Sequence, residues 1–386
     1  MAGTVLVVGA GFAGAVYARM LAEHGYAVTL VDQRPHIGGN AYDERDANGI
    51  RVHRYGPHLF HTNNAAVVEW LRRFGAWVPY EHRVRALLPT GQRVPLPVNR
   101  ATLEAVFGES LPDAAAAQAL LQRVAEPVAR PRNAAEHLHA SIGRQLTDLF
   151  FRPYTKKMWA LDLEELDASV VQRIPLRFDD EDRYFPNDKF QLLPEQGYTA
   201  IFANILDHKL IRLHTATTFH PSMLRGHAAA FLSVPIDEYF DSRFGELPYR
   251  SIRFGHRSVA RNPEITWGVT NFTDAGPVTR ETHWHVLPRH GNAEGLVTAT
   301  RETPCDYKEN GYERYYPVKT ADNRHAATLK RYQALAARTP EVQFIGRCGT
   351  YQYLDMHQVI NQSLIGAQRW LAEQGRASLA VASQVA

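Results

Sequence analysis

Three glycines and one acid near the N-terminus have the spacing to bind a dinucleotide. Gly9, Gly11 and Gly14 follow a short apolar run and open a helical pattern. In such a motif the first glycine permits a tight turn and the second lets a pyrophosphate approach the backbone. The third allows the helix to pack closely on the strand. Asp32 ends a second apolar run, where its carboxylate can accept a hydrogen bond from a ribose hydroxyl. The alternative is that the glycines mark a tight turn in some other α/β fold.

A second pair of glycines favours FAD over NAD as the dinucleotide. The stretch "QRPHIGGN" follows Asp32 directly, and its two adjacent glycines suit a second close approach of backbone to a long cofactor. The arrangement resembles the FAD proteins of the amine-oxidase and related superfamilies. The cofactor-binding residues predicted in this region are Gly9, Gly11, Phe12, Ala13, Gly14, Asp32, Gln33, Arg34, Gly38, Gly39 and Asn40.

Histidine and cysteine placement argues against a metal centre. His58 and His61, like His283 and His285, stand close in sequence, but no third ligand is spaced to join either pair. The two cysteines, at 305 and 348, cannot form a four-ligand zinc site, and a chain of this length argues against a disulfide scaffold. We therefore predict no metal and a reducing compartment.

The elements that must position these residues can be read from hydrophobic periodicity. Strands at 4–8 and 27–32, with a helix between them that ends near residue 23, form a βαβ opening. A helix is predicted at 64–74, and two short alternating runs predict a hairpin at 83–97, around Thr90 and Gly91.

The rest of the chain divides into segments with helical patterns and segments with strand patterns. Residues 100–160 are helical and Ala-rich, and 249–303 alternate like antiparallel strands. The tail returns to α/β, with a helix at 324–337, a strand at 342–346 and a helix at 356–373.

The fold class predicted from this order is α/β. A Rossmann-like FAD-binding domain is built from both chain ends, with an inserted helical domain and an antiparallel β-sheet domain that binds substrate. The predicted boundaries are 1–80, 194–235 and 318–386 for the FAD-binding domain, 98–160 for the helical domain, and 81–97, 161–193 and 236–317 for the sheet domain.

Composition excludes several classes of protein. The 386 residues are 45% hydrophobic and carry a net charge of +3, a balance too even for a nucleic-acid binder. The N-terminus lacks the charged region of a signal peptide, and no apolar run approaches the roughly 20 residues of a membrane span. We expect a soluble, cytoplasmic protein.

Several long motifs resemble the UDP-galactopyranose mutase family. They are "VGAGFAGAVYAR", "YGPHLFHTNN" (55–64), "FFRPYTKKMWALDLEELDASVVQRIPLRF" (150–178), "RYFPNDKFQLLPEQGYT" (183–199), "YYPVK" (315–319) and "GRCGTYQYLDMHQVI" (346–360). They span nearly the whole chain, in order. The resemblance implies an isomerase that interconverts a nucleotide-linked galactopyranose and its furanose form. In this family N5 of reduced FAD attacks the anomeric carbon and expels UDP, the sugar ring opens and recloses through its 4-hydroxyl, and no net redox occurs.

The resemblance also implies a set of site residues. Arg173 and Arg280 would flank the diphosphate, because guanidiniums remain charged and can grip phosphate oxygens in a fork. His58 and His61 would lie at the flavin and the sugar and would be catalytic. His82 would lie near the sugar. The remaining substrate contacts would be Phe150, Phe151, Tyr154, Thr155, Trp159 and Asn271 at the uridine, and Tyr184, Tyr316 and Tyr353 at the diphosphate. Arg347 would touch the flavin.

The stretch "GTYQYLDMHQVI" joins a structural pattern to this chemistry. Asp355 and Gln358 are spaced as a capping box for a helix that begins at Met356, and such an N-cap is worth about 1 kcal/mol. The same helix N-terminus, lying beneath the isoalloxazine, would favour the anionic reduced flavin. Tyr353 and Asp355 are therefore assigned to both substrate and cofactor, Met356 to the cofactor, and Tyr351 to packing.

Other expectations rest on the family pattern and on departures from it. Val278 replaces a usual tyrosine, Pro153 is expected to alter or kink its helix, and Arg183 places a cation beside Tyr184. These changes lie near ligand contacts, so the same ring contraction on a different NDP-sugar stays open. We expect a reductant such as NAD(P)H or a reductase, closure of a loop near 165–185 over the ligand, and a homodimer, although no segment identifies an interface.

Two readings outside this activity also stay open. An FAD amine oxidase or desaturase would share the N-terminal motifs, but it would not need two converging arginines. A non-catalytic nucleotide-sugar binding protein would retain FAD structurally.

Overall fold

A computed structural model describes residues 3–172, 176–291, 295–318 and 320–375. A five-stranded parallel sheet carries the glycine motif. Its order is β10 (Ile211–His214), β2 (Ala27–Val31), β1 (Thr4–Val8), β11 (Ala229–Leu232) and β17 (Val342–Phe344). All neighbouring strands pair in parallel. The predicted α/β class and βαβ opening are confirmed, because α1 (Phe12–Glu23) connects β1 to β2.

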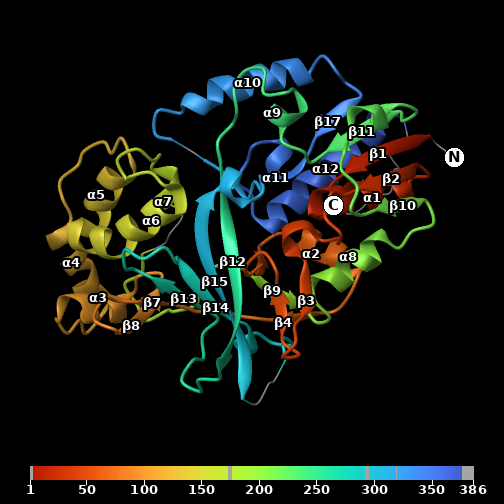
Figure 1. The fold of residues 1–386 in the computed structure, drawn as a ribbon. Coiled ribbons are helices and arrows are strands. Elements are labelled where there is room, and N and C mark those ends of the chain that lie inside the picture. Colours follow the sequence, from red (N-terminus) through yellow and green to blue (C-terminus); the bar gives the residue numbers. More distant parts are fainter. Residues whose placement is uncertain (1–2, 173–175, 292–294, 319, 376–386) are drawn as a thin grey trace, which may run out of the picture.

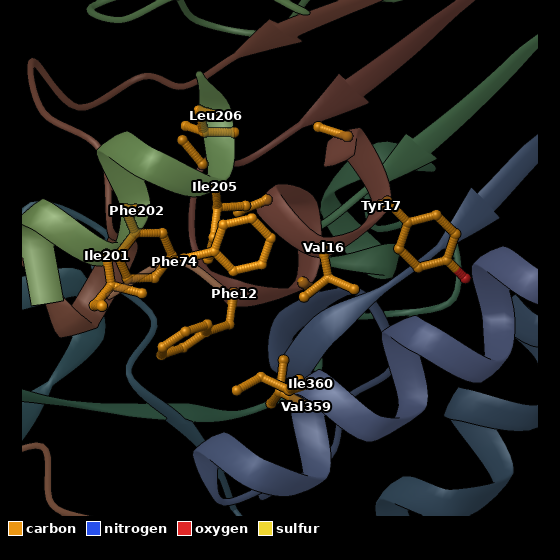
Figure 2. Close-up of a cluster of buried hydrophobic side chains, with 14 of the residues drawn as sticks. Phe12, Val16, Tyr17, Phe74, Ile201, Phe202, Ile205, Leu206, Val359 and Ile360 are labelled. Carbon is orange, nitrogen blue, oxygen red and sulfur yellow. The ribbon is translucent and has the colours of Figure 1, made fainter. Parts of the chain in front are cut away.

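Helix α1 is buried between two other helices on one face of this sheet. These are α8 (Tyr198–Leu206) and α12 (Met356–Glu373), the latter from the C-terminal end of the chain. Figure 2 shows Phe12 and Val16 of α1 between Phe202 of α8 and Ile360 of α12. The rings of Phe12 and Phe202 lie 4.5 Å apart. Distant parts of the chain therefore share one hydrophobic core, and red and blue segments lie together in Figure 1.

A seven-stranded sheet forms the second large unit. Its order is β16 (Tyr316–Pro317), β12 (Tyr249–Ala260), β15 (Leu296–Asp306), β14 (Arg280–His283), β13 (Val269–Phe272), β7 (Val84–Leu87) and β8 (Arg93–Leu96). The predicted hairpin is confirmed as β7 and β8, with Leu87 opposite Arg93. Gly91 turns this loop with a φ of 86°, a left-handed value that glycine tolerates.

A group of helices lies beside this sheet, coloured orange to yellow in Figure 1. It comprises α3 (Arg100–Phe107), α4 (Ala114–Val124), α5 (Ala134–Leu146) and α6 (Arg152–Trp159). Asn99, Asp113 and Asn133 cap the first three of these through side-chain oxygens. The predicted Ala-rich helical segment is thereby confirmed.

The helical segment before Trp159 is interrupted. Gly143 has a φ of 74°, and a Cβ there would lie 2.3 Å from the Val124 carbonyl oxygen. Residues Thr147–Phe151 then form a π-helical turn, a feature common at functional sites. Pro153 stands in the first turn of α6, directly after this π-helical turn.

Shorter elements link the two sheets. β5 (Phe60–Thr62), β9 (Phe190–Pro194) and β6 (Trp77–Pro79) form a three-stranded sheet, and β3 (Asp43–Arg45) pairs with β4 (Arg51–His53). The other helices are α2 (Ala65–Arg72), α7 (Ser169–Gln172), α9 (Ile236–Tyr239), α10 (Arg324–Ala336) and α11 (Gly346–Gly349). The predicted helices at 64–74 and 324–337 are confirmed.

Boundaries between the predicted domains stay a prediction. The strand β9 lies on one of them and pairs on both sides with strands that precede residue 80. Within the described ranges, no helix has the length and apolarity needed to cross a membrane.

Candidate active site

One cavity of about 1040 Å³ runs from the glycine motif to helix α6. It is lined by every predicted site residue that the structure describes, from both the cofactor and the substrate sets. Arg173 lies outside the described residues, and so does part of the loop expected to close over the ligand. Residues predicted from separate motifs are therefore brought to one continuous space.

The glycine motif has no room for side chains. A Cβ on Gly14 would lie 1.8 Å from the carbonyl oxygen of Gly9, and Gly9 itself has a φ of 100°. A Cβ on Gly39 would lie 2.9 Å from the Cα of Gly11. The two glycine loops therefore touch through bare backbone, a cradle that fits the pyrophosphate of a dinucleotide.

Asp32 is fixed at the end of β2 by backbone donors. Its side chain is 8% exposed, and its carboxylate accepts hydrogen bonds from the N–H of Ala10 at 2.6 Å and of Arg34 at 2.8 Å. The Arg34 guanidinium pairs with Glu313 and lies 4.2 Å from the centre of the Tyr55 ring. The carboxylate is thus held at the cavity wall.

The capping box at the start of α12 is confirmed. The N–H of Asp355 donates to Gln358 Oε1 at 2.9 Å, and Asp355 and Met356 both line the cavity. The Tyr351 hydroxyl lies 3.0 Å from the Pro248 carbonyl oxygen and 2.9 Å from that of Val318, as expected for packing. The N-terminus of α12 thus lies at the cavity wall, where its backbone N–H groups carry partial positive charge.

Arg347 lies near this helix with an unsatisfied donor. Its guanidinium carbon is 4.9 Å from the centre of the Tyr353 ring and 5.7 Å from that of Tyr315. Its Nε is buried and has no hydrogen-bond partner among the described residues. An acceptor on a bound group would satisfy this nitrogen, as the predicted flavin contact requires.

Two cavity histidines are held neutral. His58 Nδ1 lies 2.9 Å from the Gly56 carbonyl oxygen, and burial lowers the pKa of His58 to about 4. His82 Nδ1 lies 3.0 Å from the Tyr80 hydroxyl, and burial lowers its pKa to about 3. Because Nδ1 of His58 must donate to a carbonyl, its Nε2 is left as an acceptor.

His61 has a different environment. Its Nδ1 lies 2.6 Å from Asp188 Oδ2, and its ring stacks on Phe185 with centroids 3.6 Å apart and planes 8° from parallel. The His357 ring approaches edge-on at 5.7 Å. This is the one of the three predicted cavity histidines whose ring nitrogen is bonded to a carboxylate.

Arg280 is positioned by strand pairing. The β14–β15 register places it opposite Glu302, and its Nε lies 2.7 Å from Glu302 Oε2. The contact is an ion pair rather than an aligned hydrogen bond. Burial lowers the pKa of Arg280, but the charge of Glu302 more than offsets this and the net pKa is raised, so the guanidinium stays charged. The β13–β14 register places Asn271 opposite Arg280.

The predicted uridine site is built around the π-helical turn. Phe150 and Phe151 lie in that turn, and Tyr154 and Thr155 follow in the first half of α6. Burial raises the pKa of Tyr154 to about 12, so its phenol stays protonated. Trp159 packs edge-on against Tyr316 at 5.1 Å.

Tyr316 is held at the end of α6. Its hydroxyl donates to the Met158 carbonyl at the end of α6, and the side chain is almost fully buried. A phenol has one proton to donate. In this arrangement Tyr316 supports α6, and its contact with a diphosphate stays a prediction.

The departures from the family pattern also find structural partners. Arg183 pairs with Glu81 at 3.0 Å and with Glu181 at 2.5 Å, so its added charge is neutralised beside Tyr184. The carbonyl of Val278 accepts a hydrogen bond from Lys157 Nζ at 2.9 Å.

Sequence reasoning missed two groups of residues in this site. Asp188 and Glu302 are the carboxylates behind His61 and Arg280. A second group lines the cavity beyond Asp32, with Thr218, Phe219, Ser233, Val234, Pro235 and Tyr239 as members. The motif "FPNDKF" held the one available signal, an acid inside a family motif. In the part of the chain that the structure describes, no group of three or more His, Cys, Asp or Glu side chains is arranged to hold a metal ion.

Comparisons with known proteins agree with this geometry. Residues 149–353 match the family model described as UDP-galactopyranose mutase, and residues 7–74 match that of an NAD(P)-binding Rossmann-like domain. A probable UDP-galactopyranose mutase of Klebsiella pneumoniae is 35% identical over 370 residues, covering 95% of this chain and 94% of that protein. A dTDP-fucopyranose mutase of Escherichia coli is 34% identical over 376 residues, covering 95% of this chain and 98% of that protein.

The fold has a matching solved structure. The crystal structure of a reduced UDP-galactopyranose mutase superposes with a TM-score of 0.75 at 16% identity, covering 98% of this chain and 96% of the other. This likeness concerns the fold alone.

Proposed function

Because the chain belongs to the UDP-galactopyranose mutase family and is an isomerase, we propose that it interconverts UDP-galactopyranose and UDP-galactofuranose with reduced FAD as cofactor. The observation that carries the proposal is the single cavity. It joins the glycine cradle at one end to Arg280 and the aromatic residues of α6 at the other. A dinucleotide and a nucleotide sugar could therefore meet inside the protein.

The cofactor end fits FAD. When bound in its reduced form, FAD supplies an N5 nucleophile that bonds to the anomeric carbon, so that UDP leaves and later returns without net redox. The glycine loops would hold its pyrophosphate, and Asp32 would bind a ribose. The N-terminus of α12 and the free Nε of Arg347 would face the flavin, where positive potential favours an anionic ring.

The substrate end must retain a detached nucleotide diphosphate. Arg280 keeps its charge beside buried Glu302, and Arg173 would supply the second guanidinium. Tyr184 and Tyr353 line the same cavity and would donate to the phosphates. Phe150, Phe151 and Asn271 would receive the uracil and its ribose. The neutral His58 would offer an uncharged acceptor to the sugar, and His82, also neutral, would lie beside it.

A second candidate is the same ring contraction on a different NDP-sugar. The E. coli relative named dTDP-fucopyranose mutase is nearly as similar to this chain as the K. pneumoniae relative. Val278 and Arg183, which depart from the family pattern, lie close to the predicted substrate contacts Arg280 and Tyr184. UDP-galactose and dTDP-fucose substrates should therefore be compared directly.

One experiment separates the candidate activities. The purified protein is checked for a yellow chromophore, reduced with dithionite, and given each NDP-pyranose, and the products are separated by chromatography. Conversion that occurs only in the reduced protein supports the mutase. The NDP-pyranose that is converted fastest identifies the sugar and the nucleotide. Oxygen uptake with an amine would instead indicate an oxidase. Nucleotide binding without turnover in the reduced protein would indicate a non-catalytic binding protein.

The physiological reductant and the assembly belong to the same proposal. We expect NAD(P)H or a reductase to replace dithionite in the conversion assay. We also expect a homodimer, which light scattering of the purified protein checks.

A further inference from the structure

His61 and Asp188 are brought together by a strand pair. β5 and β9 run antiparallel with His61 opposite Gln191, and Asp188 lies two residues before β9 begins. The Asp188 carboxylate then accepts from His61 Nδ1 at 2.6 Å through one oxygen and from Asn63 Nδ2 at 2.8 Å through the other. Asn63 in turn accepts from the Lys189 N–H at 2.9 Å. Both carboxylate oxygens are therefore fixed by the small sheet.

The His61 ring is fixed in orientation as well. Its face stacks on Phe185, and the His357 ring meets it edge-on. Because Nδ1 donates to a carboxylate, the neutral ring carries its lone pair on Nε2. His61, Phe185 and Asp188 all line the cavity, between the start of α12 and His82. Nε2 is thus the ring nitrogen that can meet a ligand.

The proposed reaction, on which this inference rests, needs a group that both gives and takes a proton. When the bond between C1 and the pyranose ring oxygen breaks, that oxygen gains a proton. When the 4-hydroxyl bonds to C1 to close the furanose, it loses one. If one residue gives the first proton and takes up the second, the two transfers cancel and no net proton is taken from solvent.

The contacts of the cavity histidines select His61 for this task. His58 bonds to a backbone carbonyl and His82 to a phenol, and neither partner is an anion. Asp188 is an anion held against the ring of His61, so it can stabilise the imidazolium that forms when Nε2 carries a proton. Other titratable groups lie on the elements that surround His61. They are His357 in α12, Asp355 at the N-cap of α12, and His82 on the far side of Phe185.

We propose that His61 and Asp188 form a proton-transfer dyad for the ring-opening and ring-closing steps. In the direction of ring contraction, protonated His61 gives the Nε2 proton to the ring oxygen as the C1–O bond breaks. It takes a proton back from the 4-hydroxyl as the new C–O bond forms. His61 is the catalytic residue, whereas Asp188 is a positioning residue that acts through it.

The test compares two bond-breaking events in the reduced holoenzyme. Exchange of ¹⁸O between bridging and non-bridging positions of the β-phosphate in UDP-galactopyranose reports cleavage at C1, before any ring opening. Formation of the furanose reports the whole reaction. In Asp188→Asn one amide oxygen must serve two donors and the negative charge is lost, so the furanose rate should fall by ~100-fold or more. Isotope exchange and the affinity for UDP should stay at wild-type levels.

Matched variants keep the test sharp. His61→Gln should likewise slow formation of the furanose and leave the isotope exchange unchanged. Asp113→Asn, at an N-cap that asparagine fills equally well, should change neither. In ¹⁵N-histidine NMR of the oxidised protein, with His61 assigned from His61→Gln, the wild type should show a protonated Nδ1 that is hydrogen-bonded to Asp188. Asp188→Asn should shift that Nδ1 resonance, because the charged acceptor is lost.

Three outcomes would overturn the dyad. An unchanged furanose rate in Asp188→Asn would show that the proton does not pass through His61. A parallel loss of exchange, conversion and UDP affinity would show that the pair only orders the site. A wild-type protein that performs neither exchange nor conversion would overturn the proposed function, and the dyad's role with it.

Discussion

Arg280 and Glu302 form an ion pair in which only one partner reaches the cavity. The Arg280 Nε lies 2.7 Å from Glu302 Oε2, the Arg280 side chain is 29% exposed, and that of Glu302 is not exposed at all. A carboxylate without contact to water depends on its counter-charge. The guanidinium proposed to hold the diphosphate therefore also stabilises the fold.

Arg280→Ala should lower both stability and nucleotide affinity. It leaves Glu302 as a buried, unpaired charge, so the free energy of unfolding should fall by about 3–5 kcal/mol in a denaturant titration. The double variant Arg280→Ala, Glu302→Gln should recover much of that stability but none of the UDP affinity measured by calorimetry. Recovery of UDP binding in the double variant would show that Arg280 serves the fold alone.

Substitutions of two glycines should separate folding from cofactor binding. Gly14→Ala places a Cβ 1.8 Å from the Gly9 carbonyl oxygen, so it should lower the melting temperature sharply. Gly11→Ala meets protein no closer than 3.6 Å, and its φ is −80°, so the fold should be retained. Its methyl group would still enter the cavity, and flavin absorbance per protein should fall. Gly255→Ala, with its nearest contact at 3.9 Å, is the control that should change neither.

The stability of the protein should decrease in acid because of buried histidines. Burial lowers the pKa of His290 to about 4, and its side chain is 1% exposed. A folded-state pKa below the unfolded value of about 6.5 means that the unfolded chain binds more protons. The contribution is fully present above pH 6.5 and is lost as the pH falls towards 4, reaching about 3 kcal/mol for this one group.

His290→Gln should therefore flatten the dependence of the free energy of unfolding on pH between 6.5 and 4. Urea titrations at several pH values measure that slope. His214→Gln, at an exposed position on β10, should leave it unchanged. A slope in His290→Gln equal to that of the wild type would contradict the assignment.

Tyr351 should matter more than its assignment to packing implies. Its backbone has a φ of 52°, which is strained for a residue other than glycine, and its buried hydroxyl lies within hydrogen-bond distance of the Pro248 and Val318 carbonyls. Tyr351→Phe should cost about 1–3 kcal/mol of stability, because buried acceptors lose their donor. It should also raise the KM for the nucleotide sugar, since Tyr353 follows two residues later. Tyr312→Phe, at an exposed tyrosine, is the matched control for the loss of stability.

Local patterns were the part of the site that sequence could predict. The glycine motif, Asp32 and the capping box at Asp355 and Gln358 each depend on residues close in the chain, and the structure contains the local arrangements expected of them. The hairpin around Gly91 was predictable for the same reason. Such features can be predicted from sequence because their residues are close in the chain, so local backbone geometry alone determines how they are arranged.

Partners made by tertiary pairing were not predictable in this way. His61 and Asp188 are 127 residues apart, and only the β5–β9 register brings them together. The bond from Tyr316 to the Met158 carbonyl spans 158 residues, and no motif indicates which way that phenol points. The strands of three to five residues in the small sheets also escaped periodicity, since they are too short to show it.

The parallel sheet has a consequence for how the protein is made. Its outer strand β17 and the helix α12 that covers α1 come from the last part of the chain, and so do Arg347 and Met356 at the cavity wall. During synthesis the N-terminal glycine loop leaves the ribosome long before these segments exist. If these segments hold the proposed flavin, nascent chains stalled before residue 340 should carry none.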